Sequence, residues 1–96
     1  MKQKYITAGV CDQISLPTQM VIWQLAASLP LEADYLQVFR LKPGVKDSRI
    51  IQIIEQSQEQ PEFQRTFSFY CEEPVTAKLF LIDDGDYITL LLASEY

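Results

Sequence analysis

The chain has 96 residues, 48% of them hydrophobic, and a formal net charge of −5 at pH 7. This composition indicates one globular domain, residues 1–96, and excludes a disordered chain. The acidic balance argues against nucleic acid as a partner, and no run of eighteen apolar residues exists to cross a membrane. The sequence also lacks histidine, so it excludes a histidine-based catalytic triad and the commonest zinc ligand.

The first element expected is a strand at residues 4–10. Apolar and polar residues alternate there, which would place Ile6, Ala8 and Val10 on one face. Lys2 and Lys4 precede it, but no long apolar segment of a secretory signal follows them. The expected location is therefore the cytoplasm.

Residues 16–29 have the period of an amphipathic helix. Pro17 suits a first helical position, and Pro30 cannot continue the hydrogen-bond ladder. The period predicts one broad apolar face, made of Val21, Ile22, Leu25, Ala26 and Leu29.

A second, narrower apolar stripe on this helix consists of Met20, Trp23 and Ala27, with Gln19, Gln24 and Ser28 between the two. A large aromatic residue most often belongs to the core. The alternative is that the stripe is an interface with a partner protein.

Five further strands are expected after the helix. Enrichment in β-branched and aromatic residues places them at residues 35–41, 49–55, 63–70, 77–82 and 87–93. Pro43-Gly44 predicts a turn between two of them, and residues 57–62 predict an exposed loop. Asp84-Gly85 between two apolar runs predicts a hairpin with a type I′ turn.

The expected fold is α+β, with one N-terminal helix packed on a curved, mainly antiparallel sheet of five to six strands in the order β-α-β-β-β-β-β. A helix of about 12 residues is about 18 Å long and covers about two or three strands. The sheet must then curl into a partial barrel, or a second subunit must cover the remainder.

No catalytic, cofactor-binding or metal-binding residues are predicted. Asp83, Asp84 and Asp86 lack the spacing of a calcium loop and favour a plain turn. Glu72 and Glu73 are adjacent in sequence and are expected to be solvated, with nothing to raise a pKa for acid–base work.

Cys11 and Cys71 are expected to be reduced and to act as small apolar residues. Cys11 lies just before the helix, so a reactive thiol is the alternative. On the strand at residues 63–70, Arg65 beside Phe67 and Phe69 is similar to the aromatic strand of RNA readers. The acidic charge favours core-facing rings instead, with Arg65 at a strand edge.

Several stretches together resemble a known family. They are residues 5–10 (YITAGV), the helix with Trp23, 34–39 (DYLQVF), 59–62 (EQPE), 82–87 (IDDGDY) and 91–96 (LLASEY). Their order is similar to domain-of-unknown-function family nine-sixty, small proteins of Gram-positive bacteria, although residues 49–60 are richer in Ile and Gln than the family pattern. The resemblance covers nearly the whole chain and implies a complete, stand-alone, intracellular bacterial protein. It implies no activity.

Two functions are compatible with these features. The first is a non-enzymatic protein-interaction module that binds a second copy or another protein, through Met20, Trp23 and Ala27 or through an uncovered sheet face. The second is a small-ligand binder, with a helix–sheet groove lined by Trp23, Tyr35, Phe39 and Phe67. A third, enzymatic, hypothesis depends on Cys11 alone.

Overall fold

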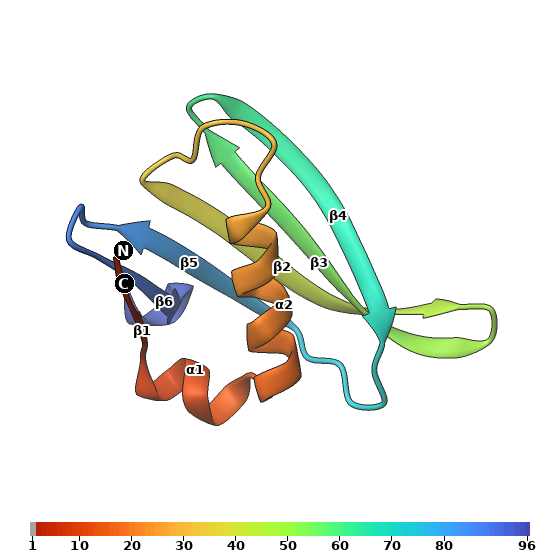
Figure 1. Cartoon of the computed structure of the whole chain (residues 1–96). Coiled ribbons are helices and arrows are strands. Elements are labelled where there is room, and N and C mark those ends of the chain that lie inside the picture. The colour runs from red at the N-terminus through yellow and green to blue at the C-terminus, as the bar shows by residue number, and fades with distance from the viewer. Residues whose placement is uncertain (1) are drawn as a thin grey trace.

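The computed structural model describes residues 2–96, which form an α+β fold (Figure 1). The elements are β1 (Gln3–Ile6), α1 (Ala8–Gln13), α2 (Leu16–Ala27), β2 (Leu36–Lys46), β3 (Arg49–Glu59), β4 (Glu62–Tyr70), β5 (Ala77–Asp83), β6 (Tyr87–Leu92) and the 3-10 helix η1 (Ala93–Glu95). The predicted fold class is confirmed. The predicted order is wrong at the N-terminus, where two helices stand in place of one.

The six strands form one sheet in the order β1-β6-β5-β2-β3-β4. The four pairs between β6 and β4 are antiparallel, as predicted, whereas β1 runs parallel to β6. Because β1 pairs with the last strand of the chain, its direction depends on the whole fold and not on a local turn. The sheet is not closed, and α1 and α2 lie on the same side of it (Figure 1).

The N-terminal segment departs from the expected strand after Ile6. Thr7 is the N-cap of α1, and its hydroxyl oxygen accepts the Val10 N–H at 3.3 Å. Val10 and Ile14, four residues apart, are both buried. A spacing of four residues is typical of one face of a helix. The alternation of Ile6, Ala8 and Val10 obscured this signal in the sequence.

Helix α2 is confirmed, and four residues of its predicted broad face pack in or against the core, namely Val21, Ile22, Leu25 and Ala26. Thr18 and Gln19 are buried together with Ile22 and Leu25. The Gln19 amide donates to the carbonyl oxygen of Ile14 at 2.7 Å, which allows this polar side chain to lie inside. The prediction that Gln19 separates two apolar stripes is therefore wrong.

Strands β2 and β3 are longer than predicted and form a hairpin that projects from the body (Figure 1). Pro43 and Gly44 are inside β2, and the turn is at Asp47 and Ser48, whose φ values are 52° and 63°. The pairing of β2 with β5 ends at Leu41, so β2 has no neighbouring strand on its β5 side at Pro43. Proline, which lacks a backbone N–H, is tolerated at such an edge position.

The exposed loop predicted at residues 57–62 is also mostly strand. The pairing of β3 with β4 continues to Glu59 opposite Glu62. Gln58 is buried, and its amide donates to the carbonyl oxygens of Glu32 and Pro61, both at 2.9 Å. A polar composition was misleading here because one partner of Gln58, the Glu32 carbonyl oxygen, comes from the distant loop after α2.

The hairpin between β5 and β6 is confirmed, with a different turn. The Asp84 N–H donates to the Tyr87 carbonyl oxygen at 2.9 Å, so Gly85 and Asp86 are the central residues. Only Gly85 has positive φ, 96°. Glycine at the first central position is the pattern of a type II′ turn instead of the expected type I′.

The core lies between the helices and one face of the sheet. Side chains from both helices meet those of β2, β3, β5 and β6 in a single cluster, which contains Val10, Ile14, Ile22, Leu25, Phe39, Leu41, Ile54, Leu79, Leu81, Leu90 and Leu92. No helix among residues 2–96 has the length and apolarity that a bilayer crossing requires.

Candidate functional site

The side of the sheet away from the helices is the largest candidate surface. Alternation along each strand assigns its residues, because Phe39 and Leu79 point into the core and their neighbours point away. The register places Val38, Phe80 and Leu91 side by side, and Leu36, Ile82 and Thr89 in the next row. We call the surface around these six residues the open face.

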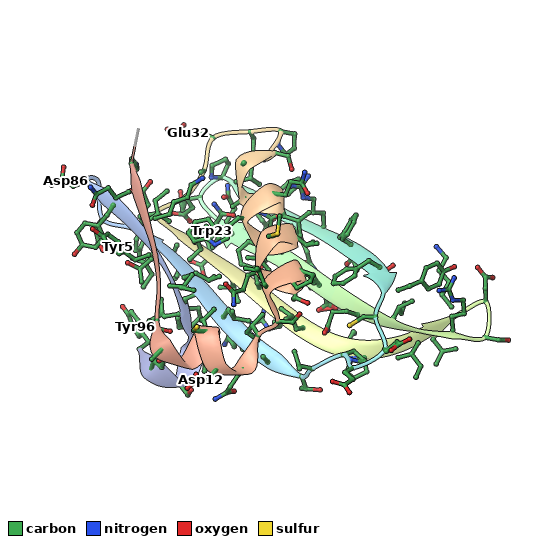
Figure 2. All side chains as sticks on the ribbon, turned by 60° about the horizontal axis from the view of Figure 1, so that its bottom comes forward. Tyr5, Asp12, Trp23, Glu32, Asp86 and Tyr96 are labelled. Carbon is green, nitrogen blue, oxygen red and sulfur yellow. The ribbon has the colours of Figure 1, made fainter. Side chains whose placement is uncertain are left out.

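Tyrosines surround the apolar centre of the open face. The Tyr5 and Tyr87 rings meet edge to face with centroids 5.6 Å apart, and the Phe80 and Tyr96 rings do so at 5.5 Å. Tyr96 is 82% exposed and Tyr35 is 66% exposed. Figure 2 shows Tyr5 and Tyr96 near one margin of the molecule.

The open face is hollowed at two places. A hollow of about 410 Å³ is lined by Tyr35, Tyr87 and Tyr96 together with Leu36, Ile82 and Leu91. A second hollow, of about 280 Å³, lies over β3, where Val38 and Arg40 line it with Glu59 and Gln64. The surface is therefore uneven and apolar at its centre.

Charged residues lie at the two ends of the open face. Arg40, Lys42 and Lys78 follow its apolar rows toward the β2–β3 hairpin, and Lys42 pairs with Glu55 at 3.2 Å. At the opposite end are Glu59 and Glu62, directly paired across β3 and β4, and Asp84. Arg40 and Lys78 form no ion pair within residues 2–96.

The predicted interface stripe on α2 is only partly exposed. Met20 is 64% exposed and Ala27 is exposed, but Trp23 between them is half-buried and packs against the core. Figure 2 shows Trp23 between α2 and the sheet. The Lys4 ammonium lies 5.6 Å from the centre of its ring, beside a small cavity of about 120 Å³.

The four residues predicted to line a groove do not surround one cavity. Phe39 is fully buried in the core, and Trp23 covers the core from the helix side. Tyr35 lines the hollows of the open face, on the other side of the sheet. Phe67 is 43% exposed on the edge strand β4, beside Phe69.

A different helix–sheet cavity, of about 530 Å³, lies at the junction of α1 and α2. Cys11, Ile14 and Leu16 line it from the helices, and Gln52 and Val75 from the sheet side. Gln52 is fully bonded there, since it accepts the Val75 N–H at 2.8 Å and donates to the Val75 carbonyl oxygen at 3.0 Å. Cys11 is exposed, and both it and Cys71 are free thiols.

Asp83, Asp84 and Asp86, which were considered as calcium ligands, do not form a metal-binding cluster with other side chains of residues 2–96. Within residues 2–96, no three His, Cys, Asp or Glu side chains gather where they could hold an ion. The hydrogen bond from the Lys2 ammonium, then that from the Gly85 N–H, lowers the pKa of Asp83. This carboxylate thus stays ionised as part of the turn.

Residues 3–95 match the family described as "Staphylococcal protein of unknown function (DUF960)". The chain belongs to this family. The match spans nearly the whole sequence and confirms the resemblance seen in its motifs. The family description names no activity, so membership in DUF960 assigns no catalytic or binding residue.

One solved structure shows the same fold as this DUF960 chain. It is the crystal structure of a protein of unknown function from Enterococcus faecalis, with a TM-score of 0.80 and 20% sequence identity. The similarity covers 99% of this chain and 91% of that one. No curated protein matches the sequence.

In this DUF960 protein, the side chain of Glu95 forms a hydrogen bond with Thr7, the N-cap residue of α1. Its Oε1 accepts the Thr7 hydroxyl at 2.6 Å and the Leu92 N–H at 2.8 Å. The Thr7 hydrogen bond, followed by that of the Leu92 N–H, lowers the pKa of Glu95. The sequence alone offers no signal for the contact between Thr7 and Glu95, because these residues lie 88 positions apart.

Proposed function

We propose that this DUF960 protein is a non-enzymatic, cytoplasmic protein-interaction module and that the open face is its contact surface. A second copy of the chain is the simplest partner. The observation that supports this proposal is a sheet face that no α-helix of residues 2–96 covers, with exposed tyrosines around an apolar centre in which Leu91 is buried and the other residues are half-buried.

The size of the open face suits a protein partner. Six strands at about 4.8 Å spacing are about 29 Å wide, and six or seven residues of strand are about 20 Å long. The resulting footprint is about 600 Å² per partner, which corresponds to the lower end of the size range of specific, stable interfaces.

The composition of the open face points the same way. Tyrosine is enriched at protein interfaces, where its ring supplies contact area and its hydroxyl stays hydrogen-bonded. Tyr35, Tyr87 and Tyr96 supply such rings around Leu36 and Ile82. Charged groups lie two or more residues from the central row, toward the rim of the surface, where interfaces are polar and solvent-accessible.

The α2 stripe is the less favourable contact surface. Trp23, its largest member, already packs against the core and is therefore partly withdrawn from a partner. Met20 and Ala27 alone offer little apolar area. This comparison favours the sheet face over the helix.

The test measures molar mass by light scattering during size exclusion, at a series of protein concentrations. We expect the wild-type chain to self-associate and Val38→Glu, at the centre of the open face, to remain monomeric. Met20→Glu is the matched control, because it adds the same charge to an exposed apolar residue of α2. A monomeric wild type, or loss of association in Met20→Glu alone, contradicts the proposal.

A second candidate function is small-ligand binding in the cavity at the α1–α2 junction. Its volume of about 530 Å³ lies in the ordinary range of ligand pockets, and it combines Ile14, Leu16 and Val75 with polar groups. A thermal-shift screen of metabolites tests it. A ligand that raises the melting temperature of the wild type but not of Leu16→Trp, which would fill the cavity, supports this function.

A further inference from the structure

The charges of the open face are sorted along the strand direction. Taking the row of Val38 and Phe80 as the centre, Arg40 and Lys78 lie two residues away toward the hairpin. Glu59 lies two residues beyond Ser57, the partner of Val38, in the opposite direction. Each step of two residues is about 7 Å. Positive and negative ends are thus about equally far from the central row.

Asp84 extends the negative end on β5. It lies two residues beyond Ile82 and therefore four residues from Phe80, on the side away from Lys78, and it lines the tyrosine hollow. At the positive end, Glu55 of β3 lies directly opposite Arg40, and its carboxylate is engaged by Lys42. Arg40 and Lys78 therefore carry the uncompensated charge there.

We infer that two copies of the chain pack open face to open face with their strands antiparallel, around a twofold axis that crosses the strands at the row of Val38 and Phe80. This inference rests on the proposed function. The axis places Arg40 of one copy near Glu59 of the other, on adjacent strands. Lys78 of one copy lies opposite Ile82 of the other, and Asp84 is one step of two residues, about 7 Å, farther along. Because the interface is isologous, each pairing occurs twice.

The alternative face-to-face arrangement lacks this complementarity. A twofold axis parallel to the strands would set the row of Arg40 and Lys78 opposite the same row of the second copy, and the end that contains Glu59 and Asp84 opposite the same end. Like charges would then face each other at both ends, which disfavours association. The distribution of charge therefore selects one direction of packing.

The decisive experiment exchanges the two ends of the interface. One variant carries Arg40→Glu and Lys78→Glu, and the other carries Glu59→Lys and Asp84→Lys. We expect each variant alone to associate about tenfold or more weakly than the wild type, since each substitution acts twice and replaces attraction by repulsion. An equal mixture should recover association, because opposite charges then meet at both ends.

A charge-matched control separates specific pairing from general attraction between oppositely charged proteins. Asp12→Lys with Glu72→Lys changes the net charge as much as the Glu59→Lys, Asp84→Lys variant, but its two residues are outside the open face. We expect the control to associate like the wild type, and its mixture with the Arg40→Glu, Lys78→Glu variant to form no mixed dimer.

The outcomes distinguish the two proposals. If both charge-reversed variants associate like the wild type while Val38→Glu does not, the open face is the interface and the antiparallel arrangement is wrong. The arrangement is also wrong if the mixture stays monomeric, or if the control forms mixed dimers equally well. A wild type that is monomeric at every concentration overturns the proposed function and this inference together.

Discussion

Arg65 on β4 and Gln56 on β3 are directly opposite in the sheet, and the Arg65 Nε–H donates to Oε1 of Gln56 at 2.7 Å. Both side chains also donate to the carbonyl oxygen of Leu25 near the end of α2, Arg65 at 2.6 Å and Gln56 at 3.3 Å. A helix C-terminus presents unpaired carbonyl oxygens and a partial negative charge. The pair therefore fixes the end of α2 on the sheet.

The first prediction concerns Arg65. Arg65→Ala should lower the free energy of unfolding by about 2 kcal/mol, because it leaves the buried Gln56 Oε1 without this donor and removes the charged donor from the Leu25 carbonyl oxygen. Arg65→Lys keeps the charge but loses the planar fork, so about half of the loss should remain. Urea denaturation followed by Trp23 fluorescence measures both. A loss in Arg65→Ala no greater than in Lys46→Ala, an exposed hairpin residue, would contradict this role.

The contacts of Arg65 also show what could not be predicted from the sequence. Its alternation with Phe63 and Phe67 correctly placed these side chains on one face of a strand. The pattern could not indicate that a helix terminus would lie over the middle of that face, because Leu25 is 40 residues earlier in the chain. A cation beside aromatic rings therefore resembled a binding surface or a strand edge.

The buried glutamines explain why the end of β3 was misplaced. Gln52, Gln56 and Gln58 alternate along β3 on the core side, where polarity alone predicts exposure. Each is buried because its amide finds partners from distant loops or strands. By contrast, α2 and the β5–β6 hairpin were predictable, since Pro17 and Gly85 act on their immediate neighbours.

The prediction that the helix covers only part of the sheet was also informative. One helix is too narrow for six strands, so the sequence predicted either a closing sheet or an uncovered surface. The structure has a second helix, α1, but places it on the same side as α2. The identity of the contact residues was not predictable, because the pairing of Val38 with Phe80 depends on a strand 42 residues away.

The second prediction is a pH dependence at Glu95. Its pKa in the folded chain is lowered from the ordinary 4.5 by the Thr7 hydroxyl and the Leu92 N–H. The ionised carboxylate therefore stabilises the fold above about pH 4.5, and this contribution disappears as pH falls through the lowered pKa. Glu95→Gln should melt lower than the wild type at neutral pH, and the difference should shrink in acid. A difference that is constant with pH would contradict this assignment.

The third prediction tests the close packing of Gly9 against Glu95. A Cβ atom at Gly9 would lie 2.6 Å from Glu95 Oε2 and 2.9 Å from Leu92 Cδ1. Gly9→Ala should displace the carboxylate from Thr7 and return the Glu95 pKa toward its ordinary value, as carbon-detected NMR titration would measure. Ala8→Gly, at the neighbouring exposed position, should leave that pKa lowered. An unchanged pKa in Gly9→Ala means that the helix terminus moves instead.

The last prediction separates the two surfaces that carry apolar residues. Trp23 packs against the core from α2, so Trp23→Ala should lower the free energy of unfolding by about 3 kcal/mol. Because the open face lies on the other side of the sheet, the folded variant should still self-associate like the wild type. Far-ultraviolet circular dichroism in urea measures the first effect, since the only tryptophan is removed, and light scattering measures the second. A variant of wild-type stability that no longer associates would move the interface to Met20, Trp23 and Ala27 on the helix.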